Sequence, residues 1–159
     1  MHPSPEGAQP LLYTLLVFVH IFTTMIAVGL NASYVIWIVR GTNNAASLPF
    51  ALRGVKFIDD YVANPCYLAG GATGALMIVM GKPVAPFLWV AIGLYVLAMA
   101  LAYGVYTPLL SQQITMLEAR GADDAQYRAL ARRSNQVGAA MGVLVVIILA
   151  LKIFEPPLW

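Results

Sequence analysis

Long runs of apolar residues, separated by short polar segments, make up most of the chain. The pattern predicts four membrane-spanning helices, at about residues 11–39, 57–80, 86–119 and 126–154. Each run is long enough to cross the hydrocarbon core of a bilayer, which takes roughly 20 helical residues. We therefore predict an all-α integral membrane four-helix bundle, in which residues 1–159 form a single transmembrane domain.

The polar segments suggest where these helices begin and end. The segment 42–56 is predicted as a loop because it is polar and contains Pro49. The acidic pair Asp59 and Asp60 suits the first turn of the second helix, where negative charge is favoured. Asp123 and Asp124 are similarly placed to cap the fourth helix.

Composition agrees with this class of protein. Hydrophobic residues make up 60% of the chain and charged residues 10%, whereas soluble domains are roughly a quarter charged. The net charge of +2 comes from cations beside the helix ends, so nucleic-acid binding is not implied. The single cysteine, Cys66, excludes an intramolecular disulfide.

The distribution of cations predicts the orientation in the membrane. Cytoplasmic loops carry the excess of Lys and Arg. Seven cations follow the first and third helices, namely Arg40, Arg53, Lys56, Arg120, Arg128, Arg132 and Arg133, against two on the opposite side, Lys82 and Lys152. We expect both termini outside and the two longer loops in the cytoplasm.

Glycines at four-residue spacing mark candidate packing surfaces. Gly70 and Gly74 form such a pair in the second helix, and Gly138 and Gly142 in the fourth. Small residues let helix backbones approach closely where hydrocarbon provides no hydrophobic drive. These faces could pack the bundle internally, or they could bind other membrane-protein subunits or a second copy.

His20 is the candidate ligand because it is the only histidine or charged side chain deep within a predicted span. It lies nine residues after Leu11, roughly 14 Å into the membrane at 1.5 Å per residue. The same depth holds Gly70, Met99 and the region of Gly142. An intramembrane ionisable residue is by default a functional-site hypothesis, although His20 could simply bond a Thr, a Tyr or a backbone carbonyl across the bundle.

A tetrapyrrole is the cofactor that such a histidine could bind. His20 would be the metal ligand for haem b or a similar group, and Gly70, Gly74 and Gly142 would leave room for a flat ring. The other histidine, His2, lies in a polar tail, so bis-histidine ligation within one chain is not expected. Ligation with Met99, Met77 or Met141, five-coordination, ligation across a homodimer and a chlorophyll-type magnesium all remain open.

Other polar features are weaker. Asp59 and Asp60 could gate protons or a cation, but a helix cap is the simpler interpretation. Pro65 and Pro108 are expected to kink their helices and could release carbonyls into a polar cavity. No residue is assigned a catalytic role, and a non-enzymatic protein is favoured.

Several short motifs resemble one family. Their order resembles that of the predicted integral membrane proteins called domain of unknown function 2269. The motifs are Val19-His20, Asp59-Asp60, Asn64-Pro65, Thr73-Gly74, Trp89, Pro108 to Gln112, Tyr127, Arg132-Arg133 and Lys152 to Pro156. This resemblance implies a four-helix bundle in a bacterial inner membrane, without an assigned activity. More remotely, the first span is similar to that of copper-resistance-D-like and membrane protoporphyrinogen oxidase proteins, which implies a ligand role for His20 alone.

Two functional hypotheses follow from these features. The first is a non-catalytic accessory or assembly subunit of a larger membrane complex, motivated by few embedded polar groups and by the small-residue helix faces. The second is a tetrapyrrole-binding redox or porphyrin-handling protein with His20 as axial ligand.

Overall fold

A computed structural model describes residues 5–44, 46–81 and 83–157, and the side chains of residues 5–10 are not described. His2, Lys82 and Trp159 therefore lie outside the described part. The described elements are all helical: α1 (Pro5–Thr42), α2 (Leu48–Ile58), η1 (Asp59–Ala63), α3 (Asn64–Val79), α4 (Pro86–Leu101), η2 (Ala102–Tyr106), α5 (Thr107–Arg120) and α6 (Ala125–Phe154). They form four continuous rods, each long and apolar enough to span a membrane. The predicted all-α architecture is confirmed.

The second rod begins earlier than the sequence pattern predicts. Helix α2 starts at Leu48, nine residues before the expected start at residue 57 (57 − 48 = 9). Pro49 stands in the first turn, where proline is favoured because its missing N–H would be unpaired anyway. The predicted polar loop 42–56 is therefore mostly helix, and Pro49 starts that helix rather than interrupting a loop.

Two of the rods contain a π-helical turn just before a proline. In η1 the Asn64 N–H bonds to the carbonyl of Asp59, five residues back, and Pro65 follows. In η2 the Thr107 N–H bonds to Ala102 in the same way, and Pro108 follows. A proline ring would collide with the carbonyl four residues earlier in a regular α-helix. The wider turn removes that conflict without ending the helix.

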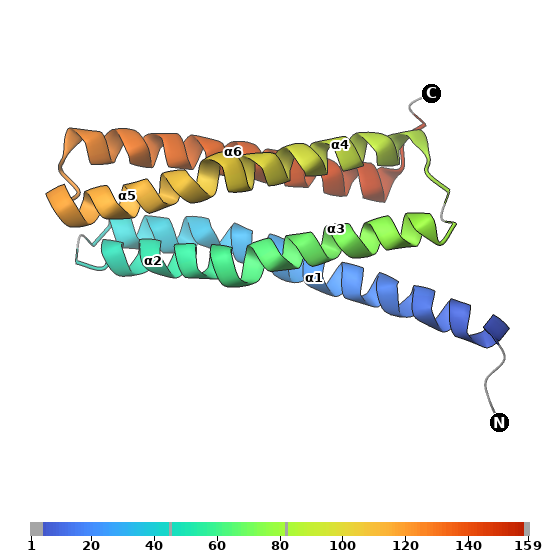
Figure 1. The fold of residues 1–159 in the computed structure, drawn as a ribbon. Coiled ribbons are helices and arrows are strands. Elements are labelled where there is room, and N and C mark those ends of the chain that lie inside the picture. Colours follow the sequence, from blue (N-terminus) through green and yellow to red (C-terminus); the bar gives the residue numbers. More distant parts are fainter. Residues whose placement is uncertain (1–4, 45, 82, 158–159) are drawn as a thin grey trace.

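The rods pack as two pairs, which are held together mainly at one end (Figure 1). We call the end with the α1–α2 and α5–α6 connections, residues 43–47 and 121–124, the loop end. The opposite end, with the connection 80–85, is the terminal end. Helix α1 packs on α3 and α4 packs on α6, while α2 joins α5 near the loop end.

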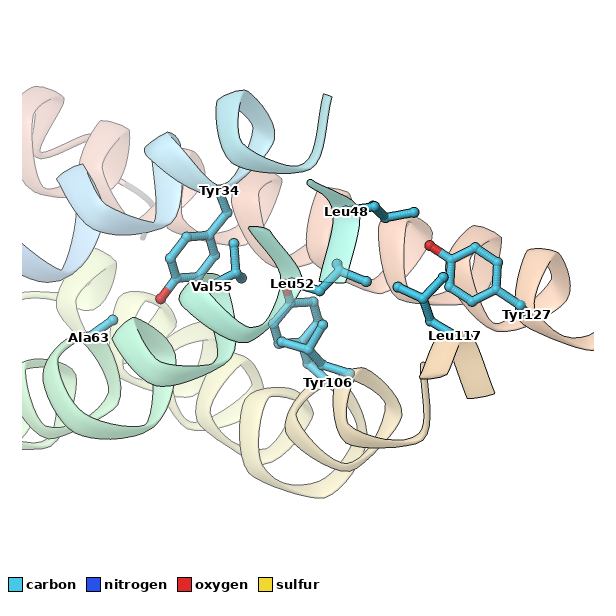
Figure 2. Packing of buried hydrophobic residues seen from close by; sticks show 9 residues of the cluster. Tyr34, Leu48, Leu52, Val55, Ala63, Tyr106, Leu117 and Tyr127 are labelled. Carbon is cyan, nitrogen blue, oxygen red and sulfur yellow. The ribbon is translucent and has the colours of Figure 1, made fainter. Parts of the chain in front are cut away.

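The hydrophobic core lies in the half of the bundle nearer the loop end. Leu52 and Val55 of α2 and Leu110 of α5 are fully buried. Tyr34 and Tyr106 close around them from α1 and η2 (Figure 2). At the outer limit of this half, the Asp124 carboxylate accepts hydrogen bonds from the N–H groups of Gln126 and Tyr127, which confirms its predicted role as the cap of α6.

Replacing a core leucine should destabilise the bundle far more than replacing a lipid-facing one. Leu52→Ala removes a side chain with no exposed surface and should cost about 2–5 kcal/mol of unfolding free energy. Leu68→Ala, on a side chain that is 52% exposed, should cost less than about 1 kcal/mol. Unfolding of both variants in detergent micelles measures the difference, and equal losses would contradict this position of the core.

Candidate functional site

Among the described side chains, the most buried charged group is Asp59, at the first position of η1. Its side chain is 4% exposed. Oδ2 accepts hydrogen bonds from Asn64 Nδ2 and Thr107 Oγ1, both at 3.1 Å. Oδ1 accepts a longer one, at 3.4 Å, from the hydroxyl of Tyr34. One carboxylate thus connects three rods: the first through Tyr34, its own, and the third through Thr107.

Both proline turns contribute to this cluster. Asn64 and Thr107 are the residues immediately before Pro65 and Pro108, and each is also the residue whose N–H makes the five-residue backbone bond. The turn that accommodates each proline therefore also places a donor side chain on Asp59. A buried carboxylate needs such donors, because transfer of a charge out of water is costly unless it is hydrogen-bonded.

The expected helix-capping role of Asp59 and Asp60 is wrong. Because α2 begins at Leu48, the acidic pair lies inside a continuous rod, where no free N–H groups of a first turn are available. Asp60 forms an ion pair with Lys56, one turn earlier. Asp59 lies in the bundle interior, as its burial shows.

His20 faces α3, as its depth in the sequence predicts. Its Nδ1 lies 2.8 Å from the carbonyl oxygen of Gly70, which can only accept, so Nδ1 carries the hydrogen. In the neutral ring Nε2 is then the basic nitrogen. A Cβ on Gly74 would lie 3.3 Å from His20 Cε1, so a glycine at this position lets the ring lie close to α3.

Further polar contacts lie between His20 and Asp59 along the same interface. The Thr73 hydroxyl donates to the Gly70 carbonyl at 3.0 Å. Asn31 donates to the Tyr67 hydroxyl at 2.8 Å. His20, Asn31 and Tyr34 therefore all lie on the α1 side of the interface with η1 and α3. From His20 to Tyr34 this face extends about 21 Å along α1 at 1.5 Å per residue.

The other predicted site residues belong to the second helix pair. Met99 is on α4, which packs on α6. Gly142 is on α6, and a Cβ there would meet nothing within 4 Å, whereas a Cβ on Gly138 would lie 3.4 Å from Tyr106. The structure thus brings together His20, Gly70 and Gly74, and it holds Met99 and Gly142 on a different pair of helices.

The sequence analysis did not predict that Asp59 and its hydrogen-bond donors join the rods of the bundle. A signal for it existed, because each proline inside a predicted span follows a side chain that can donate a hydrogen bond, Asn64 or Thr107. Hydropathy does not reveal the two π-helical turns, whose positions bring these side chains together on Asp59.

These features define the class of protein as a polytopic α-helical membrane protein with a hydrogen-bonded interior carboxylate. The chain belongs to a family described as predicted integral membrane protein (DUF2269), whose model matches residues 14–156. No curated protein and no solved structure matches the chain.

Removing the charge of Asp59 should loosen the bundle. In Asp59→Asn, one oxygen that accepts hydrogen bonds becomes an NH₂ group, which faces existing donors. Leaving buried polar groups unsatisfied costs about 1–3 kcal/mol. Unfolding in detergent micelles measures this loss.

Asp60→Asn is the matched control for that experiment, because it makes the same chemical change at the adjacent position. Asp60 is partly exposed, and its ion pair in the described part of the chain is with Lys56, so its loss should cost less than about 1 kcal/mol. A larger effect at Asp60 than at Asp59 would show that the buried cluster does not hold the rods together.

Proposed function

We propose that this protein is a non-catalytic accessory or assembly subunit of a larger complex in a bacterial inner membrane. Its partner is another membrane protein, and one transmembrane helix of that partner docks between α1 and α6. Both termini lie on the outer side, because the cations are concentrated at the loop end. The main support is an open groove between the two helix pairs.

This groove has a volume of ≈310 Å³ and is lined by Thr24, Met25, Val28 and Gly29 of α1 and by Leu149 of α6. A Cβ on Gly29 would meet nothing within 4 Å. Gly142 precedes Leu149 by seven residues, so both lie on the same face of α6. Gly29 lines this groove with open space before it, and Gly142 lies two turns along α6 from Leu149, so small residues at membrane depth suit the close approach of another helix.

The glycine pair of α3 is used within the chain. A Cβ on Gly70 would lie 3.0 Å from the Thr24 hydroxyl, and Gly74 lies against His20. That face packs α3 on α1. Association through the groove therefore relies on Gly29 and Gly142 rather than on Gly70 and Gly74.

Filling the groove should disrupt partner binding without unfolding the chain. Gly29→Leu has space within the monomer and raises local helix propensity, but it blocks the backbone approach of a partner helix. We expect at least a tenfold loss of the membrane proteins that co-purify stoichiometrically in mild detergent, measured by quantitative mass spectrometry.

Gly93→Leu is the matched control, since a Cβ on Gly93 of α4 also meets nothing within 4 Å and Gly93 does not line the groove. It should retain the partners. Wild-type protein that purifies without stoichiometric partners, or equal losses in both variants, would contradict docking in this groove.

A second candidate function is tetrapyrrole binding, with His20 as axial ligand. The observation in its favour is the hydrogen bond from Nδ1 to the Gly70 carbonyl, which fixes the ring and leaves Nε2 basic. Histidines that bind metals commonly donate their other ring N–H in this way. His20 would hold the metal, and a haem b or similar group would supply redox chemistry. Met99, one of the candidate second ligands, lies on the other helix pair.

The absorption spectrum tests this candidate. If His20 binds a haem, protein purified from haem-replete cells absorbs in the Soret region, and His20→Ala abolishes that band. Thr73→Val, which removes a neighbouring hydroxyl at 3.3 Å from Nδ1, should keep it. A colourless wild-type protein that also takes up no added haemin would reject haem ligation at His20.

A further inference from the structure

A second groove lies between α5 and α6, on the side of the bundle nearer the loop end. It is shallow and open, with a volume of ≈430 Å³. Its lining combines polar and apolar groups: Gln112 and Met116 from α5, and Gln126, Ala129, Leu130 and Arg133 from α6. Two amides and a guanidinium therefore lie beside a thioether and an aliphatic side chain.

The position of Arg133 along α6 places this groove at the edge of the hydrocarbon. From Val137 to Phe154 the helix has one charged residue, Lys152, near its end. This stretch of 18 residues (154 − 137 + 1) is about 27 Å long at 1.5 Å per residue, close to the roughly 30 Å of the hydrocarbon core. Arg133 lies one turn before this apolar stretch and therefore at the level of the lipid headgroups.

The charge near the groove is not neutralised by the chain. Arg53 pairs with Glu118, and Arg120 lies near Asp124. By contrast, Arg128, Arg132 and Arg133 are exposed and have no ion pair among the described residues. Of these three, Arg133 lines the groove and brings an unpaired guanidinium to it, while Arg128 and Arg132 add positive charge on other sides of the same helix.

We propose that the α5–α6 groove binds the headgroup of an anionic phospholipid. The Arg133 guanidinium holds the phosphate, since its planar fork matches phosphate oxygens. The amides of Gln112 and Gln126 bond to the polar headgroup, and Met116 and Leu130 contact its carbon atoms. A lipid fits better than a soluble phosphate because the groove is partly apolar and lies at the membrane boundary.

Native mass spectrometry of the full-length protein in detergent tests this proposal. The protein is titrated with phosphatidylglycerol and with phosphatidylcholine of the same acyl chains. Phosphatidylglycerol should bind at least fivefold more tightly. Arg133→Gln should weaken phosphatidylglycerol binding about fivefold, the effect of about one cation near a membrane surface, and should weaken phosphatidylcholine binding less, because the choline cation offsets the charge of its phosphate.

Arg40→Gln is the matched control. Arg40 is also exposed, has no ion pair among the described residues and lies near the loop end, but it does not line the groove. Its loss should change binding less than twofold. Gln126→Leu, which leaves the net charge unchanged, should weaken phosphatidylglycerol binding two- to threefold and guards against a folding defect specific to Arg133→Gln.

Four results would overturn the proposal. Equal weakening by Arg133→Gln and Arg40→Gln would mean general attraction to a cationic surface. Equal affinity for the two lipids would remove the headgroup preference. Displacement of the lipid by millimolar glycerol 1-phosphate would indicate a site for soluble phosphates. A protein that co-purifies with wild type but not with Arg133→Gln, while lipid binding is unchanged, would identify the groove as a protein-binding surface.

Discussion

The architecture depends on the side-chain hydrogen bonds that stabilise one carboxylate inside the bundle. Asp59 is almost completely buried, and a charge in this environment is stable only with several donors around it. Those donors come from three rods through Tyr34, Asn64 and Thr107. Because separation of the first or the third rod would remove a hydrogen bond from this buried carboxylate, the half of the bundle near the loop end has one favoured arrangement. The core around Leu52 and Leu110 packs on this arrangement.

The prolines explain why the donors are so well placed. A proline in a membrane helix removes a backbone hydrogen bond, and hydrocarbon provides no water to replace it. Here each proline is accommodated by a π-turn, and the residue before it directs a polar side chain to Asp59. Beyond this cluster, the Tyr95 hydroxyl of α4 donates to the Tyr67 carbonyl of α3 at 3.0 Å and joins the two pairs once more, while α1 and α6 border an open groove toward the terminal end. The bundle therefore has one half, near the loop end, that is held together by hydrogen bonds, and one half, near the terminal end, that is open.

Hydropathy was sufficient to predict the four rods, because their apolar runs exceed what hydrocarbon requires. Depth counting placed Gly70, Met99 and the region of Gly142 level with His20, since helical rise is constant, and of these His20 contacts Gly70. The start of the second rod was mispredicted because Arg53 and Lys56 make its first turns polar, although an ion pair with Glu118 and another with Asp60 stabilise these cations on a helix. The donors before Pro65 and Pro108 are visible in the sequence, but their convergence on Asp59 could not be predicted, because it depends on two π-turns whose register leaves no periodic signal.

The two polar regions of the interior are physically distinct. His20 is part-buried, has one ring nitrogen fixed by a backbone carbonyl and lies about 21 Å along α1 from Tyr34. Asp59, by contrast, has hydrogen bonds to both oxygens and lies in the densely packed half. A fully bonded carboxylate stabilises a fixed arrangement of helices, whereas an imidazole with one basic nitrogen keeps the capacity to bind. Structure in this bundle therefore rests on Asp59, and any ligand chemistry within the membrane is better sought at His20.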